Sequence, residues 1–333
     1  MVYLLFVIGF VLVIFGANFL VDGASSIAKR FKISNLVIGL TVVAFGTSAP
    51  ELVVTVLAGI NNSNEIALGN VVGSNIFNIL LILGVAALIY PLTVHKNTVF
   101  KEIPLALLSA VLILVLGSDL FIDNEKIDVF SNYNSTSTSL LGGALSRIDG
   151  FVLLMFFAVF IFYVFATAKD SGGENEGEEI KELPIAKSVL YLLAGLTGLV
   201  FGGKWVVEGA VEIATAMGLS EKFVGLTIVA AGTSLPELAT SIVAAYKRQT
   251  DIAIGNVVGS NIFNSFFILG IGAFLNPMPI NAFAQADALV NIGASLLLFA
   301  VLFVGKRHTI GRFEGTLFLL AYVGYTVYLV MRG

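Results

Sequence analysis

Two glutamates, Glu51 and Glu237, end the same short polar motif in otherwise apolar surroundings. Gly-Thr-Ser-Ala-Pro-Glu occupies 46–51, and Gly-Thr-Ser-Leu-Pro-Glu occupies 232–237. Because proline lacks an N–H and clashes with the carbonyl four residues back, each motif predicts a bent or unwound helix. The bend would bring freed carbonyls, two hydroxyls and a carboxylate together. Such an all-oxygen set suits hard cations such as Ca²⁺ better than soft metals.

A second polar motif is repeated letter for letter. Gly-Asn-Val-Val-Gly-Ser-Asn-Ile-Phe-Asn occupies both 69–78 and 255–264. On a helix, residues spaced i, i+4 and i+8 form one polar stripe, which comprises Asn70, Ser74 and Asn78 in the first copy and Asn256, Ser260 and Asn264 in the second. Their amide oxygens are candidate ligands, and their N–H groups are candidate anchors for an opened helix. Asn75 and Asn261 lie one position off the stripe, so we expect structural roles for them.

These motifs belong to a longer duplication. Residues 39–84 align without a gap to 225–270, with 27 identities in 46 positions. The chain is 57% hydrophobic and only 12% charged, which excludes an ordinary soluble domain. A duplicated carboxylate motif at membrane depth is typical of transporters whose site lies between two repeats.

We therefore expect an all-α integral membrane protein with ten transmembrane helices in two inverted-topology five-helix repeats. The ten predicted spans are 3–28, 35–60, 65–89, 99–117, 149–168, 187–216, 222–246, 252–275, 286–305 and 312–331. The predicted units are a first repeat at 1–168, an acidic linker at 169–187 and a second repeat at 188–333.

The distribution of basic residues predicts the orientation. Five spans are an odd number, so the second repeat must enter the membrane from the opposite side. If the first loop is cytoplasmic, 13 Lys and Arg residues lie inside and 4 outside, with Lys204 within a span. This predicts a plasma-membrane protein with both termini extracellular and the linker cytoplasmic.

The environment of the two glutamates points to a cation. A glutamate within a span costs several kcal/mol unless it is paired, protonated or neutralised. No basic residue lies near Glu51 or Glu237 within its own helix, so a bound cation is the natural partner. The chain has no Cys, and its two His residues fall in predicted loops. These features do not fit a thiolate or imidazole metal site.

At these motifs the chain resembles the calcium/cation antiporter superfamily, most closely its prokaryotic sodium/calcium exchanger branch. The resemblance covers nearly the whole chain. It implies a site between the second, third, seventh and eighth helices that holds either one Ca²⁺ or several Na⁺. The ligand set that it implies comprises the carboxylates of Glu51 and Glu237, the hydroxyls and carbonyls of Thr47, Ser48, Thr233 and Ser234, the freed carbonyls of Ala44 and Ala230, and the nearby Asn78, Asn264, Ser74 and Ser260.

Two departures from relatives bear on the transported ions. Several relatives, including potassium-dependent ones, carry Asp where this chain has Asn264, so potassium co-transport is not expected. Proton/calcium relatives typically carry Glu within the Gly-Asn motif, and neither copy here does. The resemblance therefore implies sodium as the driving ion.

The resulting hypothesis is an electrogenic antiporter that exchanges about three Na⁺ for one Ca²⁺ by alternating access. The Gly-rich first and sixth helices would slide past a stiffer core. The main alternative is a proton/calcium antiporter. A channel and an intramembrane hydrolase are weaker alternatives, since no predicted span contains the His that a nucleophile would need. We expect no enzymatic activity, no cofactor, no nucleic acid and no obligate protein partner; the expected partners are Ca²⁺, Na⁺ and the lipid bilayer.

Overall fold

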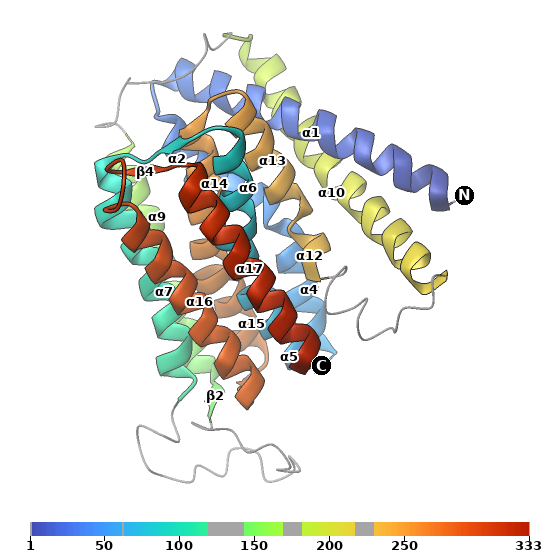
Figure 1. Cartoon of the computed structure of the whole chain (residues 1–333), viewed down its shortest axis with the longest axis vertical. Helices are drawn as coiled ribbons and strands as arrows, with labels where there is room; N and C mark the ends of the chain where they lie inside the picture. Colours follow the sequence, from blue (N-terminus) through green and yellow to red (C-terminus); the bar gives the residue numbers. More distant parts are fainter. Residues whose placement is uncertain (1, 62, 119–142, 169–181, 217–229, 333) are drawn as a thin grey trace.

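The computed structural model describes the chain except residues 1, 62, 119–142, 169–181, 217–229 and 333 (Figure 1). Its α-helices are α1 (Val2–Phe31), α2 (Asn35–Ile38), α3 (Ala44–Thr47), α4 (Ala49–Ile60), α5 (Asn64–Ile76), α6 (Leu83–Ile89), α7 (Ile103–Leu116), α9 (Arg147–Thr167), α10 (Ile185–Ala216), α12 (Ala230–Thr233), α13 (Leu235–Tyr246), α14 (Thr250–Ile262), α15 (Leu269–Leu275), α16 (Ala282–Val301) and α17 (Arg312–Arg332). Four π-helical segments interrupt or begin spans: η1 (Gly39–Val43), η2 (Phe77–Ile82), η3 (Thr98–Glu102) and η5 (Phe263–Ile268).

Membrane-spanning helices account for most of the described residues. Eight helical segments are long and apolar enough to cross a bilayer, and a bent pair, Asn35–Thr47 with Ala49–Ile60, qualifies as a ninth. These nine coincide with expected spans to within four residues. The expected span at 222–246 begins in the stretch 217–229, outside the described residues, so the predicted count of ten is not tested there.

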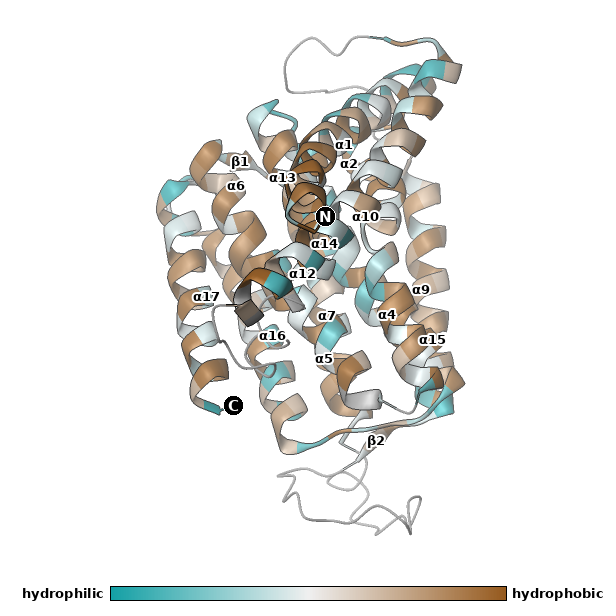
Figure 2. Cartoon of the chain, turned by 90° about the vertical axis from the view of Figure 1, so that its right-hand side faces the viewer, coloured by the Kyte–Doolittle hydropathy of each residue, from teal (hydrophilic) through white to brown (hydrophobic). Residues whose placement is uncertain are grey.

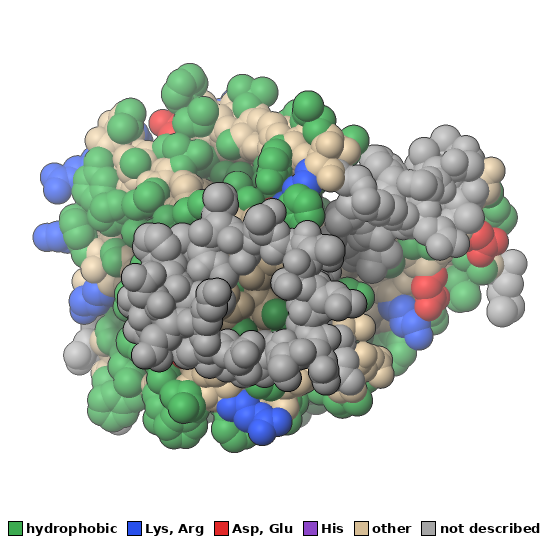
Figure 3. Space-filling model, turned by 90° about the horizontal axis from the view of Figure 1, so that it is seen from below, with side chains coloured by type: hydrophobic (Ala, Val, Ile, Leu, Met, Phe, Trp, Pro, Cys, Tyr) green, Lys and Arg blue, Asp and Glu red, His purple; other side chains and the backbone are tan. Residues whose placement is uncertain are grey.

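The helices form a buried centre and an apolar shell. In the apolar 18-residue stretch of each span, 72% of the residues are buried in Ile66–Ile89 and 83% in Thr250–Leu275, against 11% in Arg312–Arg332. The two copies of the Gly-Asn motif therefore lie in the middle of the molecule. Hydrophobic residues predominate on the outer helices, which are largely coloured as hydrophobic in Figure 2, and hydrophobic side chains cover much of the described underside in Figure 3. An exposed apolar surface of this extent matches lipid contact.

The halves of the chain are joined crosswise. Strand β1 (Leu92–Thr93) pairs antiparallel with β4 (Thr309–Ile310), and β2 (Ala144–Leu145) pairs antiparallel with β3 (Met278–Pro279). The helices follow the same pattern, because α6 packs on α17 and α15 packs on α9. Each strand pair and each of these helix pairs therefore joins one half of the chain to the other.

A seam of glycines holds α1 against α10, which is the most extensive helix contact in the described chain (Figure 1). A Cβ on Gly9 would lie 2.8 Å from the Gly202 carbonyl oxygen, and one on Gly16 would lie 2.9 Å from that of Gly195. The contact residues rise by seven on α1 as they fall by seven on α10, so the helices run antiparallel. Close backbone approach of this kind needs small residues.

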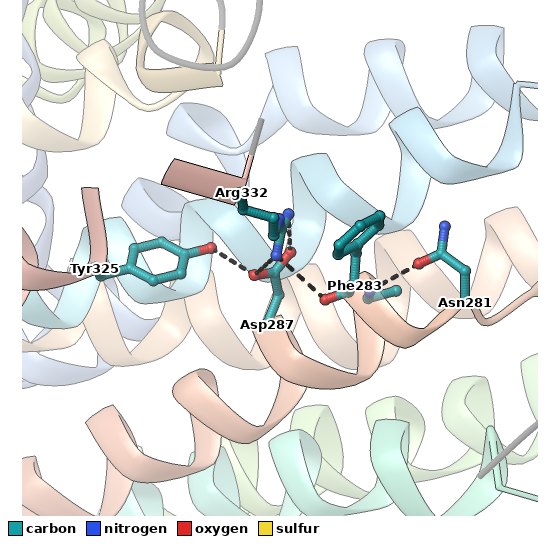
Figure 4. A network of polar contacts seen from close by, with 6 residues as sticks. Asn281, Phe283, Asp287, Tyr325 and Arg332 are labelled. Atoms are coloured by element: carbon teal, nitrogen blue, oxygen red, sulfur yellow. Dashed lines mark hydrogen bonds and ion pairs between the residues drawn. The ribbon is translucent and has the colours of Figure 1, made fainter. Parts of the chain in front are cut away.

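A charged cluster ties the C-terminal helix to its neighbour. Arg332 of α17 makes two bonds to Asp287 of α16, at 2.7 and 3.0 Å, and Tyr325 donates to the same carboxylate at 3.1 Å (Figure 4). Arg332 also lies over the ring of Phe283, 4.9 Å from its centroid. The pairing allows an aspartate to be buried within a span.

Candidate cation site

Both glutamates lie directly after a helix break. The helix before Ser48 and the helix after it meet at 46°, and Ser48 leaves the helical region with φ −80° and ψ 6°. Ser234 breaks the second copy in the same way, with φ −90° and ψ 9°. The bend predicted from the proline is confirmed at the first motif. Each glutamate therefore occupies the first turn of the following helix, α4 or α13, where the helix dipole favours a negative charge.

The two carboxylates are fully buried and are contacted crosswise. Ser234 donates to Glu51 Oε1 at 2.9 Å, and Ser48 donates to Glu237 Oε1 at 3.0 Å. Each serine therefore reaches the glutamate of the other motif. Ser74 adds a second bond to Glu51 Oε1 at 3.3 Å and accepts from Ser234 at 3.0 Å. The broken helices meet face to face around both carboxylates.

Glu237 has a matching environment in the second half of the site. Thr47 and Ser260 lie near its carboxylate, but the Ser260 hydroxyl makes no hydrogen bond among the described residues, whereas Ser74 donates to Glu51. The two carboxylates are also close enough to repel each other electrostatically. Two buried acidic groups at such proximity need a positive charge or a proton between them.

The threonines are held by the asparagines that begin the polar stripes. Thr47 donates to Asn256 Oδ1 at 3.0 Å, and Thr233 donates to Asn70 Oδ1 at 3.2 Å, again across the two halves. The amide groups of the same asparagines donate to backbone carbonyls after the breaks, Asn70 to Glu51 at 3.2 Å and Asn256 to Glu237 at 3.3 Å. The expected anchoring of the opened helix by amide N–H groups is therefore confirmed.

Besides the hydroxyl of Ser260, four buried acceptor oxygens in this region have no hydrogen-bond partner among the described residues. They are one carboxylate oxygen each of Glu51 and Glu237 and the amide oxygens of Asn78 and Asn264. All four side chains are 0% exposed. Burying an acceptor without a donor costs about 1–3 kcal/mol. These four unsatisfied acceptor oxygens, two from each half, are suited to coordinate a cation.

The sequence-predicted site residues fall into three groups. Glu51, Ser234 and Ser74 form one set of hydrogen bonds and Ser48 with Glu237 forms a second, and the two sets together make up the centre of the site. Thr47 and Ser260 border it, and Thr233 joins it through Asn70. Asn78 and Asn264 lie in the π-helical segments η2 and η5, one turn beyond Ser74 and Ser260.

One expectation is wrong in detail. The carbonyl of Ala44 is not freed, because it accepts from the Ser48 N–H at 3.0 Å and from the Thr47 hydroxyl at 3.3 Å. The helix continues to Ser48 before it breaks. Proline removes the donor to the carbonyl four residues earlier, which is that of Gly46. In the second motif Ala230 is the first residue of α12, directly after the stretch outside the described residues.

Sequence reasoning missed two features of the site, the π-helical turns and the acceptors of the asparagine amides. The π-helical turns that carry Asn78 and Asn264 have no obvious sequence signal, although such turns are frequent at functional sites. Thr55 and Ser241, which accept from Asn70 and Asn256, were findable because they occupy equivalent positions in the duplication. The two histidines are not part of the site; His95 bonds Asp251 at 3.2 Å, near β1.

Comparison with known proteins identifies the family. The sequence model of the family described as sodium/calcium exchanger protein matches residues 1–166 and 187–331. The chain is 33% identical to sodium/calcium exchanger MaX1 of Methanosarcina acetivorans, over 98% of both chains. It is 37% identical to the putative antiporter CaxA of Alkalimonas amylolytica, over 96% of this chain and 95% of that one.

Solved structures agree with the sequence relatives. The fold superposes on sodium-calcium exchanger NCX_Mj, soaked with 2.5 mM Na⁺ and 1 mM Sr²⁺, with a TM-score of 0.79 and 36% identity over 98% of this chain and 97% of that one. The likeness over nearly the full length of both chains and the match to the family model together establish the family. The chain belongs to the sodium/calcium exchanger protein family, in the prokaryotic branch of the calcium/cation antiporters.

Proposed function

We propose that this protein exchanges Na⁺ for Ca²⁺ across the membrane at the site between Glu51 and Glu237. Family membership supports a membrane transporter for calcium and another cation. The observation that carries the proposal is the pair of buried carboxylates, each bound by a serine of the other half and each with one unpartnered oxygen. In this proposal the oxygens of both halves coordinate one Ca²⁺ or several Na⁺ in turn.

The ligand set proposed is the one that the resemblance implies, adjusted for the geometry. The carboxylates of Glu51 and Glu237 are its centre, with the hydroxyls of Ser48, Ser234, Thr47 and Thr233, the amide oxygens of Asn78 and Asn264, and the hydroxyls of Ser74 and Ser260. The carbonyl of Ala44 already accepts two bonds, so its contribution requires those donors to move. The carbonyl of Ala230 is retained as its proposed counterpart.

Charge balance explains obligatory exchange. With both carboxylates ionised the site carries −2, one Ca²⁺ neutralises it, and three Na⁺ bring it to +1. A bare −2 site is far more costly to enclose in a low-dielectric interior than a neutral one. The empty carrier therefore resists interconversion, and ions of one kind must replace the other. A 3:1 cycle moves one net charge, worth about 2.3 kcal/mol per 100 mV.

Sodium is favoured over protons as the coupling ion. Neither copy of the Gly-Asn motif carries an acidic residue. The relative MaX1 is named a sodium/calcium exchanger, and the relative CaxA is named only an antiporter. A proton/calcium exchanger would use the same two carboxylates as proton carriers, so it is the alternative that the transport experiment must separate.

The same proposal includes the membrane arrangement. We place ten spans in two inverted repeats, 1–168 and 188–333, joined by a cytoplasmic linker at 169–187, with both termini extracellular. The crosswise pairing of β1 with β4 and of β2 with β3 supports two halves related by a pseudo-two-fold axis. The separate family matches to 1–166 and 187–331 support the same division.

Calcium uptake into proteoliposomes tests the proposal. Vesicles loaded with Na⁺ and diluted into Na⁺-free medium should accumulate Ca²⁺, and a pH gradient without Na⁺ should not replace the sodium gradient. Uptake should be faster when a potassium ionophore removes the inside-negative potential than when that potential is left to build up, because each cycle exports one positive charge from the vesicle. Uptake driven by a pH gradient alone would favour the proton alternative.

A further inference from the structure

Asn75 and Asn261 make a crossed contact with the two asparagines whose amide oxygens are unpartnered. Asn78 of the first half donates to Asn261 Oδ1 at 3.0 Å, and Asn264 of the second half donates to Asn75 Oδ1 at 3.1 Å. In each case the acceptor belongs to the other half. All four side chains are buried, with exposed fractions of 0 to 4%.

These contacts decide which end of each amide faces the site. An asparagine amide is a donor at one end and an acceptor at the other, and the two ends have nearly the same shape. Because the N–H₂ ends of Asn78 and Asn264 are bonded to Asn261 and Asn75, their oxygens are left without a partner. We propose that Asn75 and Asn261 are positioning residues that keep the amide oxygens of Asn264 and Asn78 directed at the cation. This inference rests on the proposed function and refines it.

Asn75 and Asn261 are themselves fixed in orientation. Asn75 donates to Ser265 Oγ at 2.8 Å, and Asn261 donates to the Asn75 carbonyl at 3.3 Å. With their N–H₂ ends engaged, their oxygens are free to accept from Asn264 and Asn78. Each chain of bonds therefore begins on one half, passes through an asparagine of the other half and ends at a candidate ligand of the half on which it began. It explains why residues one position off each polar stripe are polar.

A double-mutant cycle on ion binding tests the role. In purified protein, Asn261→Ala should weaken Ca²⁺ binding about five-fold or more, because the Asn78 amide loses its orienting acceptor. In the Asn78→Ala background the same substitution should change Ca²⁺ affinity by less than two-fold. Asn75→Ala should behave likewise with Asn264→Ala and gives an independent second cycle.

The mismatched pair is the control. Asn75→Ala combined with Asn78→Ala should be additive, since Asn75 orients Asn264 and not Asn78. Additive effects in both matched cycles would overturn the positioning role, because a purely structural asparagine would weaken binding equally in either background. Wild-type protein that binds neither Ca²⁺ nor Na⁺ would instead count against the proposed function.

An independent observation concerns α1 and α10. These helices are equivalent in the duplication, but they pack differently on the helices that follow the two breaks. The inner face of α1, with Ala17, Leu20 and Ala24, packs with Ala239 and Val243 of α13. The positions equivalent to Ala239 and Val243 are Val53 and Leu57 on α4, and these are 56% and 53% exposed. Within the described chain α10 has no comparable contact with α4.

An ion pair joins α1 to α13, the helix on which α1 packs. Lys247, at the end of α13, lies 2.6 Å from Asp22 of α1 and reaches the Asn18 carbonyl at 3.5 Å. The duplication places Glu208 opposite Asn61 at the equivalent positions, so no ion pair forms when α10 takes the matching place on α4. Among the described residues, the ion pair of Glu208 is with Lys204 on its own helix, at 3.8 Å.

We infer that the Asp22–Lys247 pair is a one-sided latch that favours the state with α1 seated on α13. Its opposite would be the state with α10 seated on Val53 and Leu57. The duplication places small or apolar residues at the matching positions of both states, and a single ion pair present in one of them shifts the equilibrium toward that state. This inference also rests on the proposed alternating access.

Cysteine labelling tests the latch, because the natural chain contains no cysteine. A Val243→Cys variant is shielded by α1 and reacts with a water-soluble maleimide only when α1 leaves. Adding Asp22→Asn or Lys247→Gln should raise its labelling rate about two- to five-fold, the factor that a partly exposed ion pair contributes. Asn61→Lys should raise the rate similarly, because it gives Glu208 a partner in the other state.

Two further variants make the result decisive. The charge swap Asp22→Lys with Lys247→Asp should restore the original labelling rate. Lys204→Gln, which removes an ion pair within α10 alone, should leave that rate unchanged. Unchanged labelling in the Asp22 and Lys247 variants, in protein that still exchanges ions, would overturn the latch and leave the proposed function intact.

Discussion

Replacing Glu51 by Gln should weaken calcium binding strongly while leaving the fold intact. Gln has nearly the same shape as Glu and keeps one oxygen to accept from Ser74 and Ser234. Its N–H₂ group takes the position of the oxygen that has no partner, so a donor replaces an acceptor where the cation is proposed to bind. The charge of the site falls from −2 to −1.

The expected loss can be estimated. Removing one member of a buried charged pair costs about 2–5 kcal/mol, which corresponds to roughly a 30-fold to several-thousand-fold loss of Ca²⁺ affinity. At a Ca²⁺ concentration 100 times the wild-type Kd, binding stabilises the wild-type protein by about 2.7 kcal/mol. With Kd raised 30-fold, the same concentration gives only about 0.9 kcal/mol.

Thermal unfolding with and without Ca²⁺ measures this difference. Without Ca²⁺ or Na⁺, Glu51→Gln should unfold at the wild-type temperature or above, because it removes repulsion between two buried carboxylates. Glu102→Gln is the matched control. Glu102 is also a buried glutamate within a span, with one oxygen bonded by Tyr163 and the other unpartnered, but it lies in η3 outside the two motifs. It should keep the full Ca²⁺-dependent stabilisation. A Glu51→Gln protein that Ca²⁺ stabilises as much as wild type would refute the reasoning.

Four other substitutions, one of them with a matched control, have defined outcomes. Ser48→Ala and Ser234→Ala should each weaken Ca²⁺ binding about ten-fold or more in calorimetric titrations, since each removes a hydrogen bond to a carboxylate worth about 1.5–3 kcal/mol; equal affinity to wild type would contradict the crosswise arrangement. Gly16→Ala should lower the melting temperature, because its Cβ would lie 2.9 Å from α10 backbone atoms, whereas Gly293→Ala, with nothing within 4 Å, should not. Asp287→Asn should destabilise the protein by about 3–5 kcal/mol by leaving Arg332 unpaired, with Ca²⁺ affinity unchanged; a loss of affinity would mean that this cluster communicates with the site.

Much of the architecture was predictable because membrane spans and a gap-free duplication leave strong sequence signals. The positions of nine spans, the bend at Ser48 and the burial of Glu51 and Glu237 follow from apolar length, proline chemistry and the cost of burying a charge. The anchoring role of Asn70 was predictable as well, because its place on the polar stripe leaves few other partners.

The contacts between the halves were not predictable from one sequence. Nothing local indicates that Ser48 bonds Glu237 rather than Glu51, since the choice depends on how the broken helices face each other. The π-helical turns at Asn78 and Asn264 are equally hidden, and the Ala44 carbonyl was wrongly expected to be free because the helix ends at Ser48, two residues before the proline. A structural role was predicted for Asn75 from its position off the polar stripe. Its bond to Asn264 joins the two halves, so a single sequence does not reveal it.

The most direct measurement is anomalous scattering from crystals grown with Sr²⁺ as a heavier substitute for Ca²⁺. We expect one strong peak between Glu51 and Glu237, with carboxylate oxygens from both halves at about 2.3–2.6 Å from it or slightly farther for the larger ion. A peak bound elsewhere, with the two carboxylates making no contact to it, would contradict the central claim that cations bind where the two broken helices meet.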